Sequence, residues 1–89
     1  MANSLQSKKR ARQEIVRHAR NVSLRSRVFT QIKKARNAIF AGEKELAQTQ
    51  VKAAFSEIDR MVPKGIFHKN RAGRLKSRLN ASLKKLVLA

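Results

Sequence analysis

The 89-residue sequence has no cysteine, tryptophan or tyrosine, and it has only one proline, three glycines and five acidic residues. Without cysteine the chain can form no disulfide or thiolate metal site, which suits a reducing compartment. No apolar run approaches the ~20 residues that a membrane-spanning helix needs. Residues 1–13 are polar and basic, without the apolar segment of a secretory signal. We therefore expect a soluble, intracellular protein.

The scarcity of acids contrasts with 22 lysines and arginines, which give a net charge of +17. Such a chain favours a polyanionic partner, because each phosphate that Lys or Arg neutralises releases condensed counterions. The charge is also uneven: residues 1–40 carry a net +10, residues 41–62 carry −1, and residues 63–89 carry +8. Two basic segments thus flank a nearly neutral one, and nucleic acid is the leading class of partner.

The few glycines and the proline divide the chain into three predicted helices. Gly42, Pro63 and Gly65 lie at the charge boundaries, where they can end a helix. We expect helices from about residue 12 to 41, from 43 to about 62, and across 72–86. Apolar residues recur at helical spacing in each. The expected core comprises Ile15, Ala19, Val22, Val28, Ile32, Ala35 and Ile39, then Ala47, Val51, Ala54, Ile58 and Met61, then Ala72, Leu75, Leu79, Leu83 and Leu86, with Phe29, Phe40, Phe55 and Phe67 beside them.

These patterns predict an all-α fold, a three-helix up-down-up bundle that forms one domain over residues 1–89. The first helix would be roughly 45 Å long and the second about 30 Å, so an extended basic N-terminal part, residues 8–20, should project from the bundle. We expect residues 1–7 to be disordered when the protein is free, and the basic segment to become ordered on binding.

The basic residues of the first helix are candidates for contact with a polyanion. Acids at i,i+4 spacing are nearly absent there, so we expect these side chains to have no internal partners and to face outward. The candidates are Lys8, Lys9, Arg10, Arg12, Arg17, Arg20, Arg25, Arg27, Lys33, Lys34 and Arg36.

A second candidate segment, residues 64–78, has two possible interpretations. In the structural one, Ile66 and Phe67 close the core while His68 or Asn70 caps the third helix. In the functional one, lysines and arginines around exposed amides clamp phosphates, with Arg71, Arg74 and Arg78 on one side of the helix. Stacking of Phe67 on a base is a weaker alternative.

Other classes find little support. The two histidines lie apart, without cysteine or carboxylate pairs at metal-ligand spacing, so we expect no metal, no cofactor and no enzymatic activity. A membrane-active amphipathic protein is disfavoured by the lack of tryptophan. A basic, nucleoid-type DNA-binding protein remains the alternative, since it would share the charge and size.

Several residues together resemble the bacterial small-subunit ribosomal protein S20 family over nearly the whole chain. The most specific stretch is Lys64-Gly65-Ile66 followed by His68-Lys69-Asn70, Ala72, Arg74 and Lys76-Ser77. Supporting positions are Lys9, Arg10, Gln13, Arg17, Asn21, Ser26, Thr30, Lys33, Lys34, Gly42, Ala47 and Asp59. Phe29, Gly73 and Leu75 depart from the pattern, which more often has a basic residue, an alanine and a basic residue there.

The resemblance implies a structural component of the small ribosomal subunit in the cytoplasm. It implies direct binding to small-subunit (16S) ribosomal RNA and a role in holding separate RNA segments together during assembly, with no membrane and no small-molecule substrate. Residues and resemblance together give these candidate RNA contacts: Lys8, Lys9, Arg10, Arg12, Arg17, Arg20, Asn21, Arg25, Ser26, Arg27, Thr30, Lys33, Lys34, Lys64, Gly65, His68, Lys69, Asn70, Arg71, Arg74, Lys76, Ser77 and Arg78.

Overall fold

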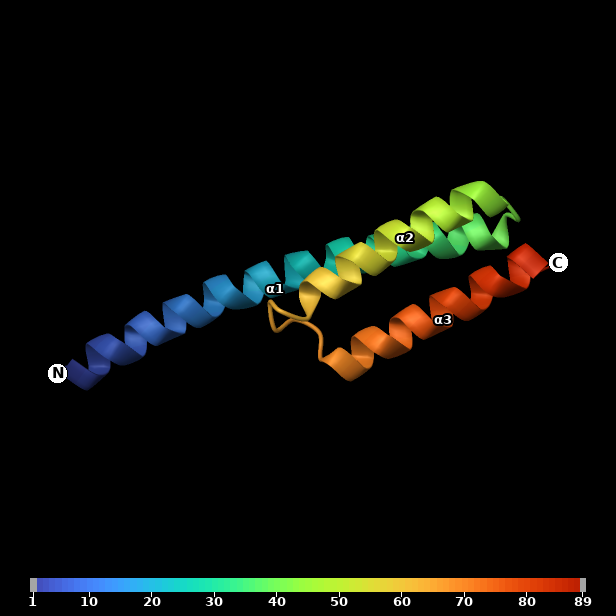
Figure 1. Ribbon diagram of the computed structural model, residues 1–89. Coiled ribbons are helices and arrows are strands. Elements are labelled where there is room, and N and C mark those ends of the chain that lie inside the picture. The colour runs from blue at the N-terminus through green and yellow to red at the C-terminus, as the bar shows by residue number, and fades with distance from the viewer. Residues whose placement is uncertain (1, 89) are drawn as a thin grey trace.

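The computed structural model describes residues 2–88, which form three helices joined by short links (Figure 1). Helix α1 spans Ala2–Phe40, α2 spans Lys44–Met61 and α3 spans Lys69–Leu88. Helix α2 runs back along the C-terminal half of α1, and α3 then follows α2 in the opposite direction. No strand occurs in this part of the chain, so the predicted all-α, up-down-up bundle is confirmed.

The molecule is a rod with a long overhang. Its extents are 67 × 21 × 14 Å, and its radius of gyration of 17.9 Å far exceeds the ~12 Å expected for a compact chain of this length. The cause is α1, whose 39 residues span about 58 Å at 1.5 Å per residue. Its N-terminal part projects beyond α2 and α3 (Figure 1), as the unequal helix lengths predicted.

Helix α1 starts at Ala2, so the predicted start near Arg12 is wrong. The segment before Arg12 contains no proline and no glycine, and Ala, Leu, Gln, Lys and Arg all favour helix. The high positive charge of this segment distinguished it from the bundle in the sequence, but the helical backbone of α1 continues through it without a break. Disorder of residues 1–7 in the free protein stays a prediction.

The core lies where all three helices meet, and it begins at Val28 rather than at Ile15. Completely or almost completely buried side chains come from every helix and from the α2–α3 link: Val28, Ile32, Ala35, Val51, Ala54, Ile58, Met61, Ile66, Phe67, Ala72 and Leu79. The second stripe of α1 and the stripe of α2 are therefore confirmed. In α3, only Ala72 and Leu79 are buried, while Leu75, Leu83 and Leu86 are half-buried.

Three of the expected core assignments are wrong: the first stripe of α1, Phe40, and Phe29, which is 39% exposed. The stripe of Ile15, Ala19 and Val22 lies on the overhang, where no other helix covers it; Ile15 is 69% exposed. Phe40, at the last residue of α1, is 95% exposed. Helical spacing identifies an apolar stripe, but it does not show how far the neighbouring helices reach along it.

The two links follow the same glycine-based geometry. Gly42 and Gly65 have φ of +79° and +73°, values that favour glycine because a Cβ is strained there. After α1, the Glu43 N–H donates to the Ala38 carbonyl and the Gly42 N–H to the Ile39 carbonyl; after α2, Ile66 and Gly65 donate to Met61 and Val62 in the same pattern. These are Schellman caps, and the second one folds Ile66 and Phe67 back onto the core.

Candidate nucleic-acid interface

The N-terminal overhang carries positive charge around its whole circumference. We call residues 8–20 the basic arm; every one of them is exposed. Successive helical residues are about 100° apart, so Lys8, Lys9 and Arg10 already point in three directions. Neither α2 nor α3 extends alongside the arm, so a polyanion can approach it from any side (Figure 1).

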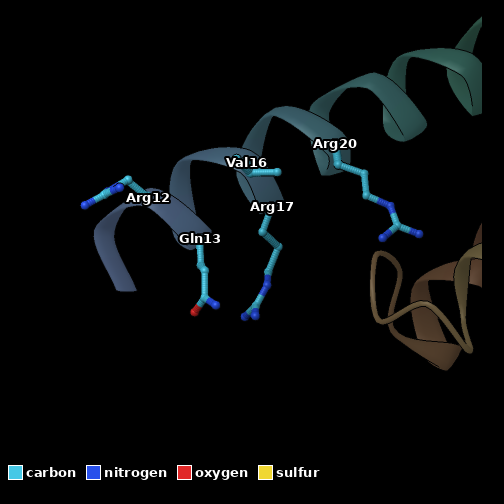
Figure 2. Close-up of a pocket in the computed structure, with 5 residues that line it drawn as sticks. All are labelled: Arg12, Gln13, Val16, Arg17 and Arg20. Atoms are coloured by element: carbon cyan, nitrogen blue, oxygen red, sulfur yellow. The ribbon is translucent and has the colours of Figure 1, made fainter. Parts of the chain in front are cut away.

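One strip of the arm combines three arginines with an apolar side chain. Arg12, Gln13, Val16, Arg17 and Arg20 line a shallow surface depression. Figure 2 shows Gln13 and Arg17 extending to the same side of α1, with Arg20 reaching toward the α2–α3 link and Arg12 pointing away from it. The strip therefore offers guanidinium forks in divergent directions, which suits contact with more than one phosphate.

Within the bundle, α1 keeps one face in solvent. Arg25, Ser26, Lys33 and Lys34 are all exposed there. The Thr30 hydroxyl donates to the Ser26 carbonyl at 2.8 Å, so it is available to a ligand only as an acceptor. Asn21, where the arm joins the bundle, is half-buried.

The expectation that the basic residues of the first helix have no internal partners is wrong for Arg27, and Lys76 on α3 is paired as well. Arg27 Nη2 lies 3.3 Å from Glu57 Oε1, and Lys76 Nζ lies 3.0 Å from Asp59 Oδ1. Glu57 also pairs with Arg60 at 3.5 Å. Glu57 and Lys76 are half-buried, but each pair has one exposed partner at the protein surface, so each contributes about 0.2–1 kcal/mol. The Arg27–Glu57 and Lys76–Asp59 pairs each join two different helices. A search for acids at i,i+4 spacing within one helix could not find them.

The start of α3 is capped by His68. Its Nδ1 accepts the Asn70 N–H at 3.1 Å, while its carbonyl accepts the Ala72 N–H at 3.0 Å. This is the N-cap position, so the structural interpretation holds for His68. Because Nδ1 is the acceptor, the neutral ring carries its proton on Nε2, an exposed donor that remains available. Phe67 is 2% exposed and belongs to the core, so it cannot stack on a base.

The outward face of α3 forms a second basic strip. Lys69, Asn70, Gly73, Arg74, Ser77 and Arg78 line a shallow surface there, opposite the buried Ala72 and Leu79. Gly73 has no atom within 4 Å of where a Cβ would stand, so it leaves the backbone bare at the middle of the strip. Arg71 differs from its neighbours, since its guanidinium lies over the rings of Phe29 and Phe67.

Most candidate residues are thus exposed and fall into two groups, the arm with the outer face of α1, and the link with the outer face of α3. The link lies beside α1, because Phe67 packs against Phe29 with ring centres 5.9 Å apart. The α2–α3 link, which contains the exposed Lys64, lies on the side of the bundle from which the arm projects (Figure 1). Gly65 has no side chain to contact a ligand, and its part in this surface is the backbone turn that shapes the link.

The list of candidate RNA contacts omits three exposed basic residues that extend these surfaces, although Arg36 was among the first-helix residues expected to meet a polyanion. Arg36 lies one turn after Lys33 on α1, and Lys85 lies two turns after Arg78 on α3, with Lys84 beside it. Helical spacing alone could have found Lys85, since seven residues return to nearly the same side of a helix. The resemblance did not include these positions.

Neither a metal site nor a membrane span emerges from residues 2–88. No three side chains among His, Asp and Glu gather closely enough there to hold a metal ion. None of the helices α1 to α3 combines the length and the apolarity needed to cross a bilayer.

Comparison with known proteins identifies the family. The family model "Ribosomal protein S20" matches residues 2–84. The chain belongs to the ribosomal protein S20 family. Relatives named small ribosomal subunit protein bS20 include that of Acinetobacter baylyi, 56% identical over 87 residues and 98% of each chain. Another, from Teredinibacter turnerae, is 57% identical over 98% of this chain and 99% of its own.

A third S20 relative, from Laribacter hongkongensis, is 49% identical over 98% of this chain and all of its own length. The resemblance based on the Lys-Gly-Ile and His-Lys-Asn stretch is thereby confirmed. The S20 family is a family of structural ribosomal proteins and not of enzymes. The alternative of a nucleoid-type DNA-binding protein is not supported, because these relatives are named as ribosomal proteins.

Proposed function

We propose that this protein is a structural component of the small ribosomal subunit in the bacterial cytoplasm, where it binds small-subunit ribosomal RNA directly and holds separate segments of it together. It performs no catalysis. The observation that carries the proposal is the basic arm, which projects from the bundle with exposed cations on all sides. Membership of the S20 family supports the ribosomal target.

The arm suits a bridging role because a charged rod that is accessible from every direction can touch RNA on opposite sides at once. A flat basic surface would meet a single RNA segment. The arm extends α1 without a break, so its orientation follows from the packing of the bundle. The bundle and whatever RNA it binds then fix the direction in which the arm enters a second segment.

The second binding surface is the outer face of α3 with the α2–α3 link. Its arginines can grip phosphates through two parallel hydrogen bonds, while Lys64 and Lys69 act as mobile point charges. A-form RNA presents a narrow major groove that a helix cannot enter, so recognition relies on phosphates, 2′-hydroxyls and the shape of the minor groove. Polar residues such as Asn70 and Ser77 supply the hydrogen bonds to such groups.

The near-neutral α2 acts as a strut between the two basic surfaces. Glu57 and Asp59 neutralise Arg27, Arg60 and Lys76 across helix boundaries or along α2. These pairs lower the repulsion that a net charge of +17 creates within so small a protein. The remaining cations lie on the outer faces, where RNA can complete the neutralisation.

The test is a salt titration of binding to a fragment of the 5′ domain of small-subunit ribosomal RNA beside a random RNA duplex of the same length. Both affinities should fall steeply with salt, since phosphate contacts dominate each complex. We expect the ribosomal fragment to stay bound at physiological salt after the random duplex is released. Coincident curves would show charge-driven binding without a ribosomal target.

A charge reversal on the outer face of α1 tests whether this helix is part of the interface. Both Lys33 and Lys34 are exposed, so Lys33→Glu with Lys34→Glu should leave the helical content unchanged in circular dichroism. We expect the double variant to lose tight binding to the ribosomal fragment. Unchanged affinity at moderate salt would remove the bundle part of α1 from the interface.

A further inference from the structure

Three parts of the chain meet around the side chain of Arg71. Its guanidinium carbon lies 5.6 Å from the centre of the Phe29 ring on α1 and 5.1 Å from the centre of the Phe67 ring in the α2–α3 link. The two rings lie 5.9 Å apart and are tilted by 59°. Arg71 itself is in the first turn of α3 and is exposed.

The two rings restrict the guanidinium, since a cation within about 6 Å of a ring centre is attracted to the face of the ring. Phe67 is 2% exposed and fixed in the core, whereas Phe29 is 39% exposed and reaches the surface. The arginine therefore rests on a rigid aromatic base. Cation–π contacts leave its N–H groups free, because the rings do not accept them in the plane of the guanidinium.

The charges around this cluster are positive. Arg25 and Lys33 stand four residues before and after Phe29, so helical spacing places them on either side of it. Within residues 2–88, no carboxylate forms an ion pair with Arg71. In this respect Arg71 differs from Arg27 and Lys76, whose charges are already paired. An anionic group at this point would meet Arg71, restrained by the two rings, and the neighbouring cations Arg25 and Lys33.

We propose that Phe29 and Phe67 hold Arg71 as a preorganised fork for a phosphate of the RNA backbone, with Phe29 acting as a positioning residue. The proposal rests on the proposed RNA-binding function. A flexible arginine loses rotamer freedom when it grips a phosphate, and that loss weakens binding. Here the folded protein has already restricted the side chain, so less freedom is lost on binding.

Two variants separate the role of Arg71 in binding phosphate from the role of Phe29 in positioning it. For each, the affinity for the ribosomal 5′-domain fragment is measured across a salt series. Arg71→Met removes a phosphate contact, so affinity should fall about tenfold or more, and the slope of log affinity against log salt should shrink by about 1. Phe29→Leu keeps every charge but removes one of the two rings that hold Arg71, so Phe67 alone restrains the guanidinium. The affinity of this variant should fall roughly 2- to 10-fold, the cost of fixing one side chain, with the slope unchanged.

The double variant Phe29→Leu with Arg71→Met decides whether the ring acts through the arginine. We expect the double variant to bind with the same affinity as Arg71→Met, because Phe29 contributes to binding only by positioning Arg71. An equal loss from Phe29→Leu in both backgrounds would show that the ring acts independently of Arg71, which would overturn the proposal. A wild-type salt slope in Arg71→Met would overturn it as well.

Matched controls come from the same chain. Phe40→Leu makes the same change at a ring that is 95% exposed, and Lys52→Met removes one charge from the exposed face of α2. Both should bind nearly as the wild type does. Urea unfolding of each variant shows that it is folded under binding conditions. If the wild type itself fails to prefer the ribosomal fragment, the proposed function fails, a result distinct from any difference among the variants.

Discussion

The basic arm allows a quantitative prediction about salt. We consider the triple variant Arg12→Gln, Arg17→Gln and Arg20→Gln, which removes the arginines of the strip in Figure 2. All three side chains are exposed on a part of α1 that packs against neither α2 nor α3. The free energy of unfolding should therefore change little, and helical content should be retained because glutamine is a good helix former.

The magnitude follows from counterion release. Each phosphate contact contributes a slope of about −0.9 to log affinity against log salt, so it costs roughly 3.5-fold in affinity for each fourfold rise in salt. If each arginine makes one contact, the wild type should lose ~40-fold more affinity than the triple variant between about 50 and 200 mM salt. Fluorescence anisotropy with a labelled ribosomal RNA fragment measures both curves.

The matched control removes the same charge elsewhere. Lys44→Gln, Lys52→Gln and Arg60→Gln lower the net charge by the same amount on the near-neutral helix α2. We expect this triple variant to keep a slope close to that of the wild type. Equal slopes for the two triple variants, both well below the wild type, would refute the reasoning, because net charge rather than the position of the arm would then govern binding.

Three further predictions concern stability, each read from urea unfolding. Gly73→Ala should stabilise α3 by up to about 1 kcal/mol, because nothing lies within 4 Å of the added Cβ; destabilisation would reveal a hidden clash. His68→Ala should cost about 1 kcal/mol by removing the cap on the Asn70 N–H, and His68→Asn should recover most of it; equal losses would argue against the cap. Ile58→Ala, at a fully buried position, should cost about 2–5 kcal/mol, a large fraction of the stability of so small a bundle; a loss below 1 kcal/mol would contradict the core.

Much of the fold could be predicted because the sequence has few helix-breaking residues and they lie where the helices end. Gly42 and Pro63 to Gly65 lie near the observed ends of α1 and α2, and the apolar stripes from Val28 onward are the observed core. The start of α1 could not be predicted in the same way. A polar, basic segment without helix breakers can be helical or disordered, and neither composition nor periodicity decides between the two.

Contacts between helices account for what sequence reasoning missed at the site. The pairing of Arg27 with Glu57 and of Lys76 with Asp59 depends on which faces meet, and periodicity within one helix does not report it. The same holds for Phe29, which spacing assigned to the core and which instead supports Arg71 at the surface. Exposure of the remaining cations was predictable, because lysine and arginine are seldom buried without a partner.

The most direct test of the bridging role is hydroxyl-radical probing of full-length small-subunit ribosomal RNA bound to this protein. We predict protection of two segments that are far apart in the RNA sequence. The triple arm variant Arg12→Gln, Arg17→Gln and Arg20→Gln should lose one of these protections and keep the other, since the outer face of α3 is unchanged. Protection of a single continuous segment, lost uniformly in the variant, would contradict the role of the protein as a bridge between RNA segments.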